Sequence, residues 1–311
     1  MNNTELPPLR RRGAWGEVKK IMKMKKIIIS IVTLAAICSL QVAAQAIHEF
    51  SVDVGGGLST LSYKPSRGNR SGSFGGDFGV GYTYYRARER VTGTERIFRE
   101  LWGIHTGLGI GMYNAQTNLD NQKLPEIKGL NDGDAVYSNF NLRTTLNSYT
   151  ETQKTVYLNI PVMALFQIEQ IYAMGGFKFG IPISGKYSSK NATITNEGYY
   201  PDLENSATTQ EFAGYGPFRG KNFEGDLQPG VAVMLALEAG YKWRIADNLS
   251  VYTGLYFDCG LNNTIKDSAK SFVNYTNKHP KDFTTNSVLT TFANKTKPMA
   301  VGIKLRFAME K

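Results

Sequence analysis

Three histidines are the residues of this chain best suited to acid–base chemistry, and they are scattered along it. Histidine acts as a catalytic base when a nucleophile and an orienting acid lie beside it, and a lone histidine predicts that arrangement only weakly. We interpret His105 as a side chain that forms hydrogen bonds in the interior. His48 lies beside the predicted cleavage site of the N-terminal leader, and His279 stands in the segment NKHPKD, where no pocket is predicted. We therefore expect no catalytic residue.

The residue types and spacings in the sequence give equally little support to a metal or phosphate site. The two cysteines, Cys38 and Cys259, are far apart, so no zinc-ligand spacing exists. The segment NDGD at 131–134 is similar to a calcium loop, but Asn139 stands where such a loop needs an acid. The glycines between 107 and 111 are spaced by two, unlike a phosphate-binding G-x-G-x-x-G segment. We expect neither a metal nor a cofactor.

The charged residues form a more informative set, because ten of them fall on the polar face of segments in which apolar and polar residues alternate. Such a set forms either a gated, ion-selective path or a salt-bridge network that fills a narrow interior. We favour the network, because buried charges are tolerated mainly when they are paired. The ten residues are the acids Glu49, Asp53, Asp77, Glu238 and Asp258 and the bases Lys178, Lys242, Arg244, Lys304 and Arg306.

Eight segments with a period of two position these charges. In residues 300–310, for example, Val301 and Ile303 alternate with Gly302 and Lys304. An apolar face turned outward and a polar face turned inward are typical of a β-barrel in lipid. The segments span about 48–62, 73–86, 100–113, 154–168, 170–187, 229–245, 248–261 and 300–310.

Long and short connections alternate between these segments. The long ones lie near 63–72, 114–153, 188–228 and 262–296, and the shorter ones lie near 87–99, 167–170 and 246–248. This is the plan of an outer-membrane barrel, with long loops outside the cell and both termini in the periplasm. We therefore predict an all-β, eight-stranded antiparallel transmembrane β-barrel with long extracellular loops.

Two further features bear on this prediction. Pro161 and Pro182 lie inside predicted strands, where each deletes a ladder hydrogen bond, so we expect them to mark bulges. Aromatic residues from five strands fall at one predicted depth, the periplasmic end, as interfacial tyrosine and tryptophan do. These aromatic residues are Tyr82, Tyr84, Trp102, Phe166, Tyr241, Trp243 and Phe307.

The N-terminal residues predict export. Three lysines precede the apolar run 27–40, and Ala44 and Ala46 follow it, so we interpret residues 24–46 as a secretory signal peptide. Residues 1–23 are expected to be a non-native or misassigned extension, and 47–311 the barrel domain. Residues 1–44 hold eight bases and two acids, or +6 of the total +10, which leaves +4. The charge therefore gives no support to nucleic-acid binding.

Several segments resemble a known family. YLNIPVMALF (157–166), GGFKFGIPISGKY (175–187), FGGDFGVGYTYY (74–85) and WGIHTGLGIGMY (102–113) are similar to the outer-membrane β-barrel domain widespread in Bacteroidota, which includes PorT-like proteins and barrels like the OmpA transmembrane domain. The resemblance implies an eight-stranded barrel in the outer membrane, but not one activity. Gly302, Leu305 and Phe307 resemble the terminal-strand signal that the barrel-assembly machinery reads, although four residues follow the last aromatic residue.

We predict a non-catalytic outer-membrane scaffold or surface-contact protein. The alternatives are a component of a secretion or assembly apparatus, as in PorT-like proteins, a lipid-active enzyme, or a small pore. The expected partners are outer-membrane lipid and lipopolysaccharide, the barrel-assembly machinery, and secretion-system or surface proteins. The last long loop either anchors to lipopolysaccharide phosphates or is solvated. Its lysines are Lys266, Lys270, Lys278, Lys281, Lys295 and Lys297, against Asp267 and Asp282.

Overall fold

The computed structural model describes residues 46–311, apart from 65, 93–95, 132–138, 266–270 and 277–278. The predicted extension 1–23 and all but the last residue of the predicted signal peptide lie outside the described residues. Among the described residues, helices long and apolar enough to cross a membrane are absent.

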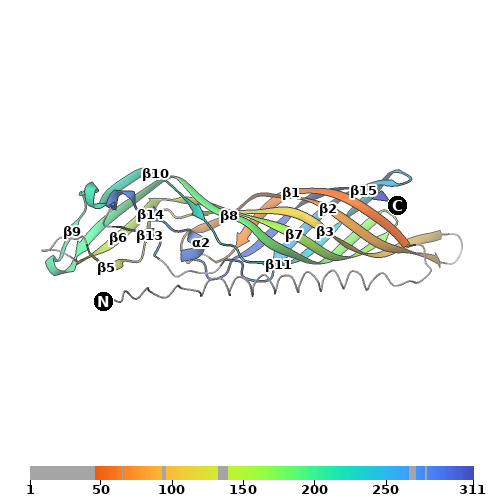
Figure 1. The fold of residues 1–311 in the computed structure, drawn as a ribbon, viewed down its shortest axis with the longest axis horizontal. Coiled ribbons are helices and arrows are strands. Elements are labelled where there is room, and N and C mark those ends of the chain that lie inside the picture. The colour runs from red at the N-terminus through yellow and green to blue at the C-terminus, as the bar shows by residue number, and fades with distance from the viewer. Residues whose placement is uncertain (1–45, 65, 93–95, 132–138, 266–270, 277–278) are drawn as a thin grey trace, which may run out of the picture. The chain divides into compact units, whose positions relative to one another are not determined.

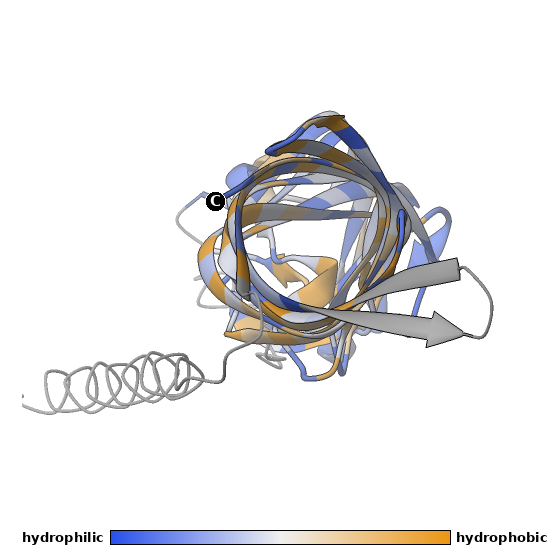
Figure 2. Ribbon diagram, turned by 90° about the vertical axis from the view of Figure 1, so that its right-hand side faces the viewer, coloured by the Kyte–Doolittle hydropathy of each residue, from blue (hydrophilic) through white to orange (hydrophobic). Residues whose placement is uncertain are grey.

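Eight long strands of the described chain form a ring in which each strand pairs antiparallel with its two neighbours (Figures 1 and 2). The last strand pairs with the first, so the ring has no free edge. The predicted eight-stranded antiparallel barrel is confirmed. Its strands are β1 (Ala46–Ser62), β2 (Asn69–Thr92), β3 (Arg96–Asn118), β7 (Thr150–Ile168), β8 (Ile171–Tyr200), β11 (Ala232–Ala246), β12 (Leu249–Gly260) and β15 (Lys297–Glu310).

The period of two in each strand separates an apolar outer surface from a polar interior. Across the closing seam, Val54 and Leu305 stand opposite each other and are exposed, whereas Asp53 and Arg306 stand opposite each other and are buried. The same separation holds around the ring. In Figure 2 the colour of the strands alternates between hydrophobic and hydrophilic residues. The exposed apolar side chains include Phe50, Val52, Phe78, Val80, Leu108, Ile110, Phe177, Leu237, Leu255, Val301 and Ile303.

The seam between the first and last strands depends on a pair of glycines. Gly57 of β1 stands opposite Gly302 of β15. A Cβ atom added at Gly57 would collide with the carbonyl oxygen of Val301, and one added at Gly302 would collide with the carbonyl oxygen of Gly56. Only glycine lets the two backbones approach this closely without displacement.

Aromatic side chains gather at the predicted periplasmic end. Trp102 and Trp243 are more than half exposed on the outer surface. The ring of Trp102 packs against Phe166 at 4.4 Å between centroids, and Tyr241 packs against Trp243 at 4.5 Å. These pairs suit the interface between hydrocarbon and water, where an apolar ring with a polar atom is favoured.

The connections differ from the prediction in two ways. The segment 87–99 is largely strand, because β2 and β3 remain paired as far as Thr92 and Arg96. The loops at 114–153 and 188–228 are also more ordered than predicted, since β8 continues to Tyr200 and pairs with short strands on both sides. The strands that pair with β8 are β6 (Asn139–Ser148), β9 (Asn205–Ala207) and β10 (Gly216–Asp226), with η1 (Pro201–Leu203) and η2 (Glu211–Ala213) between β8 and β10. Two further strands, β4 (Gln122–Lys123) and β5 (Ile127–Asn131), pair with β6.

The described residues of the last long connection, 262–265, 271–276 and 279–296, pack over the extracellular end of the ring. This connection contains β13 (Val273–Asn274), η3 (Pro280–Asp282), β14 (Thr284–Thr285) and α2 (Val288–Thr291). Phe272, Phe283 and Leu289 are buried in one cluster with Leu61 of β1 and Tyr113 of β3. The expectation of a solvated loop is therefore wrong for this buried part. Of its lysines, Lys281 and Lys295 are exposed and Lys297 begins β15, while Lys266, Lys270 and Lys278 lie outside the described residues.

The two strand prolines behave differently. At Pro182 the β7–β8 register shifts, since Val156 pairs with Ser184 and Tyr157 pairs with Pro182, so the predicted bulge is confirmed. At Pro161 the prediction of a bulge is wrong. The β3–β7 register is the same on both sides of this residue, and only the pairs that Pro161 and Ile160 would form with β3 are missing. Toward β8, Pro161 pairs with Lys178.

A closed ladder predicts heat modifiability. The folded protein in mild detergent should migrate differently on a gel from the boiled protein, because every barrel strand is paired on both sides and detergent cannot open an edge. The measurement is gel mobility before and after boiling. Identical mobility of the two samples would contradict the closed ring.

The alternation of long and short connections predicts which turns reach the cell surface. An epitope inserted at Asn131 or Asn274 should be labelled on intact cells, because extracellular loops carry the accessible residues. An epitope at Asp247, in the tight turn between β11 and β12, should be labelled only after permeabilisation. Labelling in the reverse pattern would show that the barrel has the opposite orientation in the membrane.

Candidate functional site

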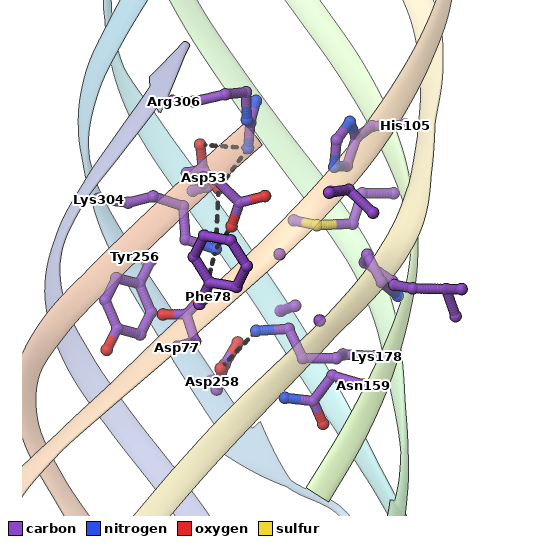
Figure 3. Close-up of a pocket in the computed structure, with 18 of the residues that line it drawn as sticks. Asp53, Asp77, Phe78, His105, Asn159, Lys178, Tyr256, Asp258, Lys304 and Arg306 are labelled. Carbon is purple, nitrogen blue, oxygen red and sulfur yellow. Dashed lines mark hydrogen bonds and ion pairs between the residues drawn. The ribbon is translucent and has the colours of Figure 1, made fainter. Parts of the chain in front are cut away.

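Nine of the ten predicted lumen charges lie in the interior of the barrel, contributed by six strands. Eight of the nine are buried, and Asp77 is half-buried. The placement follows from the period of two, which turns every second residue of β1, β2, β8, β11, β12 and β15 inward. Figure 3 shows side chains of this set, among them Lys178, Lys304 and Arg306, converging from opposite walls of the barrel.

Lys304 and Arg306 form the centre of this network. Lys304 Nζ lies 2.8 Å from Asp77 Oδ2, 3.3 Å from Asp53 Oδ1 and 3.9 Å from a carboxylate oxygen of Glu238. Arg306 Nη2 donates to both carboxylate oxygens of Glu238, at 2.7 and 2.9 Å. Glu238 thus joins the two cations, and the four strands that carry these residues are tied together across the lumen.

Two further ion pairs extend the network along the barrel axis. Toward the extracellular side, Lys178 Nζ lies 2.6 Å from Asp258 Oδ2. Toward the periplasmic side, Lys242 Nζ lies 3.1 Å from Glu49 and 2.6 Å from Glu310. Glu310 was not predicted, although its position two residues beyond Ala308 on the inward face of β15 indicates it.

Arg244 is the one predicted lumen residue that the structure places elsewhere. It is exposed near the end of β11, at the periplasmic mouth. It takes part in none of the ion pairs between the described residues. The alternation turns Arg244 toward the same side as Lys242. At Arg244, however, β11 extends beyond the closed part of the ring.

Tyrosine hydroxyl groups complete the network, and the sequence analysis missed them. Tyr85 and Tyr252 donate to Glu49, at 3.2 and 2.7 Å. Tyr172 donates to Glu238 at 2.9 Å, and Tyr113 donates to Asp258 at 3.2 Å. The sequence does indicate this placement, because each of these tyrosines stands on the inward side of its alternating segment.

The histidines lie in three separate places. His105 is buried, and its Nδ1 atom lies 2.9 Å from Thr83 Oγ1, as expected for an interior hydrogen-bonding residue. His48 Nδ1 lies 2.7 Å from the Tyr82 hydroxyl, and His279 is exposed before η3. Within the described part of the chain, no group of three His, Cys, Asp or Glu residues is arranged to hold a metal ion.

A second polar cluster surrounds Glu151, whose side chain is buried near the extracellular end of the barrel. Its carboxylate accepts hydrogen bonds from Tyr149 at 3.0 Å and from Gln153 at 2.9 Å. It also accepts from the Ser287 hydroxyl at 2.5 Å and the Val288 backbone N–H at 3.1 Å. Burial, followed by the charge of Glu151, raises the pKa of Tyr149, so this phenol remains a donor. Glu151 therefore fastens the start of α2 to β7.

Little open space remains within the ion-pair network. The cavity within the ion-pair network has a volume of about 30 Å³ and is lined by residues that include Asp77, His105, Asn159 and Lys178. A space of this size has room for only a few water molecules.

The three residues of the predicted assembly signal lie on the last strand. Leu305 and Phe307 are exposed on the outer surface of β15. Gly302 lies at the seam with β1.

Comparisons with known proteins agree with this architecture. The family model for the outer membrane protein beta-barrel domain matches residues 41–266, more than half of the chain. The search among curated proteins found no match.

Solved structures that are similar to the chain come from several bacteria. One is the attachment invasion locus protein Ail of Yersinia pestis in complex with a heparin analogue, with 10% identity, a TM-score of 0.29, and coverage of 84% of this chain and 99% of that chain. A major outer membrane protein of Thermus thermophilus has 14% identity, a TM-score of 0.25, and coverage of 85% and 99%. The outer membrane protease OmpT of Escherichia coli has 11% identity, a TM-score of 0.24, and coverage of 88% and 98%.

These TM-scores are too low to support an argument, so the assignment rests on the family model. The ring of eight strands and its apolar outer surface are typical of a transmembrane β-barrel. The chain therefore belongs to the outer membrane protein beta-barrel domain family, and its place is the outer membrane.

Proposed function

We propose that this protein is a non-catalytic scaffold or surface-contact protein whose lumen is closed. The observation that carries the proposal is the filled interior, in which the ion-pair network leaves a cavity of only about 30 Å³. An eight-stranded barrel has an interior just wide enough for side chains, and here charged residues and tyrosines occupy it. Above them, Val288 and Leu289 of α2 are buried over the extracellular end of the ring.

The arrangement of the histidines also favours a role without catalysis. A hydrolytic site needs a base, a nucleophile and an acid within reach of a substrate. His105 is buried in the packed lumen, and His279 lies in an exposed loop far along the chain. Substituting either histidine by alanine should leave lipid A and the surface proteins of the cell chemically unchanged.

A second proposal concerns a secretion or assembly apparatus. The segments 157–166 and 175–187, which resemble PorT-like proteins of Bacteroidota, form the middle of β7 and the neighbouring part of β8. Beyond them, β6, β8 and β10 build an extracellular sheet that offers a large contact surface. Co-purification of the full chain with a large complex from native outer membranes would support this role, whereas isolation of the chain with lipid alone would count against it.

Two segments of the sequence would direct the chain to the outer membrane. We propose that residues 24–46 direct export and that Gly302, Leu305 and Phe307 present the terminal strand to the barrel-assembly machinery. The outward position of Leu305 and Phe307 on β15 supports the second of these assignments.

A closed lumen predicts the absence of conductance. In planar-bilayer recordings, the wild-type protein should give no steady single-channel current, since the charged network and α2 fill the path. Large, stable currents from the wild-type protein would show an open path and would overturn the closed-lumen proposal.

Breaking the central ion pair should destabilise the barrel without opening it. In Glu238→Gln, Arg306 keeps its charge but loses its anionic partner, which costs about 3–5 kcal/mol for a fully buried pair and less if water enters. The measurement is the unfolding midpoint in detergent, followed by bilayer recording. Glu224→Gln, at an exposed position on β10, is the control and should change the midpoint very little. An equal effect of both variants would contradict the network.

Removing the Glu151 carboxylate should destabilise the start of α2 locally. In Glu151→Ala, the Ser287 hydroxyl and the Val288 N–H lose their acceptor, so the start of α2 should exchange its amide hydrogens faster. Hydrogen-exchange mass spectrometry of residues 287–292 would measure this change, with the β1–β15 seam as an internal control. Unchanged exchange at 287–292 would show that Glu151 does not fasten the helix.

A further inference from the structure

Two lysines of like charge face each other on the outer surface of the barrel. Lys154 of β7 and Lys186 of β8 are direct cross-strand partners, and both are exposed. The residues on either side of Lys154, Gln153 and Thr155, are buried, so the lysine points outward. Directly opposite residues have Cβ atoms about 4.5–5.5 Å apart, and like charges in these positions are destabilising. Taken by itself, the contact between these two lysines is therefore unfavourable.

The pair lies just above the apolar surface of the same strands. On β8, Ile183 follows toward the membrane and is strongly exposed. On β7, Val156 and Leu158 are the next outward residues and are partly exposed. Two residues along β7 cover about 6.6 Å and three along β8 cover about 10 Å, so the lysines stand where hydrocarbon gives way to lipid headgroups. Their long stems can lie along the apolar surface while the ammonium groups reach the polar layer.

The neighbouring strands neutralise the pair only in part. On β3, the partner of Lys154 is the uncharged Asn114. On β10, the partner of Lys186 is Asp226, which is exposed. Neither lysine forms one of the ion pairs between the described residues. Two cations and one acid leave net positive charge at the level of the headgroups.

We propose that Lys154 and Lys186 together bind a phosphate group of an outer-leaflet lipid, of the kind that lipopolysaccharide carries. A phosphate placed between the two ammonium groups replaces their repulsion with two charge-assisted contacts. The acyl chains of the same lipid then lie along Leu158 and Ile183. This site deepens the lipid contact expected of an outer-membrane barrel and rests on that placement, whereas the closed lumen plays no part in it.

The test compares the thermal unfolding midpoint of the folded full chain in neutral detergent with and without added lipopolysaccharide. A ligand that binds only the folded state raises the midpoint. The lipopolysaccharide-induced shift should fall by about half or more in Lys154→Gln and in Lys186→Gln. The double variant should lose little more than either single variant, because both lysines hold one phosphate. Without lipid, each single variant should be as stable as the wild-type protein or more stable.

The control is Lys190→Gln, which removes the same charge from an exposed position farther along β8 from the membrane. It should keep the full lipopolysaccharide-induced shift. An equal loss in this control, or no loss in Lys154→Gln and Lys186→Gln, would overturn the site.

Two further additions identify the ligand. Dephosphorylated lipopolysaccharide should give a shift that does not depend on the two lysines. Inorganic phosphate alone should leave the midpoint unchanged, and a lysine-dependent shift with it would indicate an anion site and overturn the lipid assignment. These readouts are independent of conductance, so a wild-type channel would remove the closed-lumen proposal and leave this one standing.

Discussion

The hydrogen bonds between β15 and β1 are the interaction on which the rest of the structure depends. In hydrocarbon an unpaired backbone N–H or C=O costs several kcal/mol, so a sheet in a membrane must have no edge. The seam supplies the last row of pairs, from Glu49 opposite Glu310 to Ser62 opposite Lys297. Gly57 and Gly302 let the two strands approach where any side chain would collide with backbone.

Closure of eight strands then dictates the chemistry of the interior. The ion-pair network of the described residues holds six acids and four bases once Glu310 is included and Arg244 is left out. The excess of acids is stabilised because Lys304 is shared among three carboxylates and because tyrosine hydroxyls donate to Glu49, Glu238 and Asp258. The network therefore ties distant strands together across the barrel and occupies the space that an open pore would need.

On the extracellular side, the strands and α2 are held together by contacts outside the ring of eight strands. Above the membrane, β8 continues to Tyr200 and has room to pair with strands that do not belong to the ring. The segment that ends in α2 returns to the barrel axis, where Glu151 receives the Ser287 hydroxyl and the Val288 N–H. The buried carboxylate of Glu151 thus connects the start of α2 to β7.

The sequence by itself determined the eight strands and which face of each is apolar, because a period of two is a local property that needs no knowledge of neighbours. It also indicated nine of the lumen charges, since the same alternation turns them inward. Only the tertiary structure decided which charges meet, because pairs such as Lys242 with Glu49 join strands far apart in the sequence and depend on register. The inward-packed 262–296 segment and the facing lysines 154 and 186 likewise depend on register and packing, which alternation within one strand does not contain.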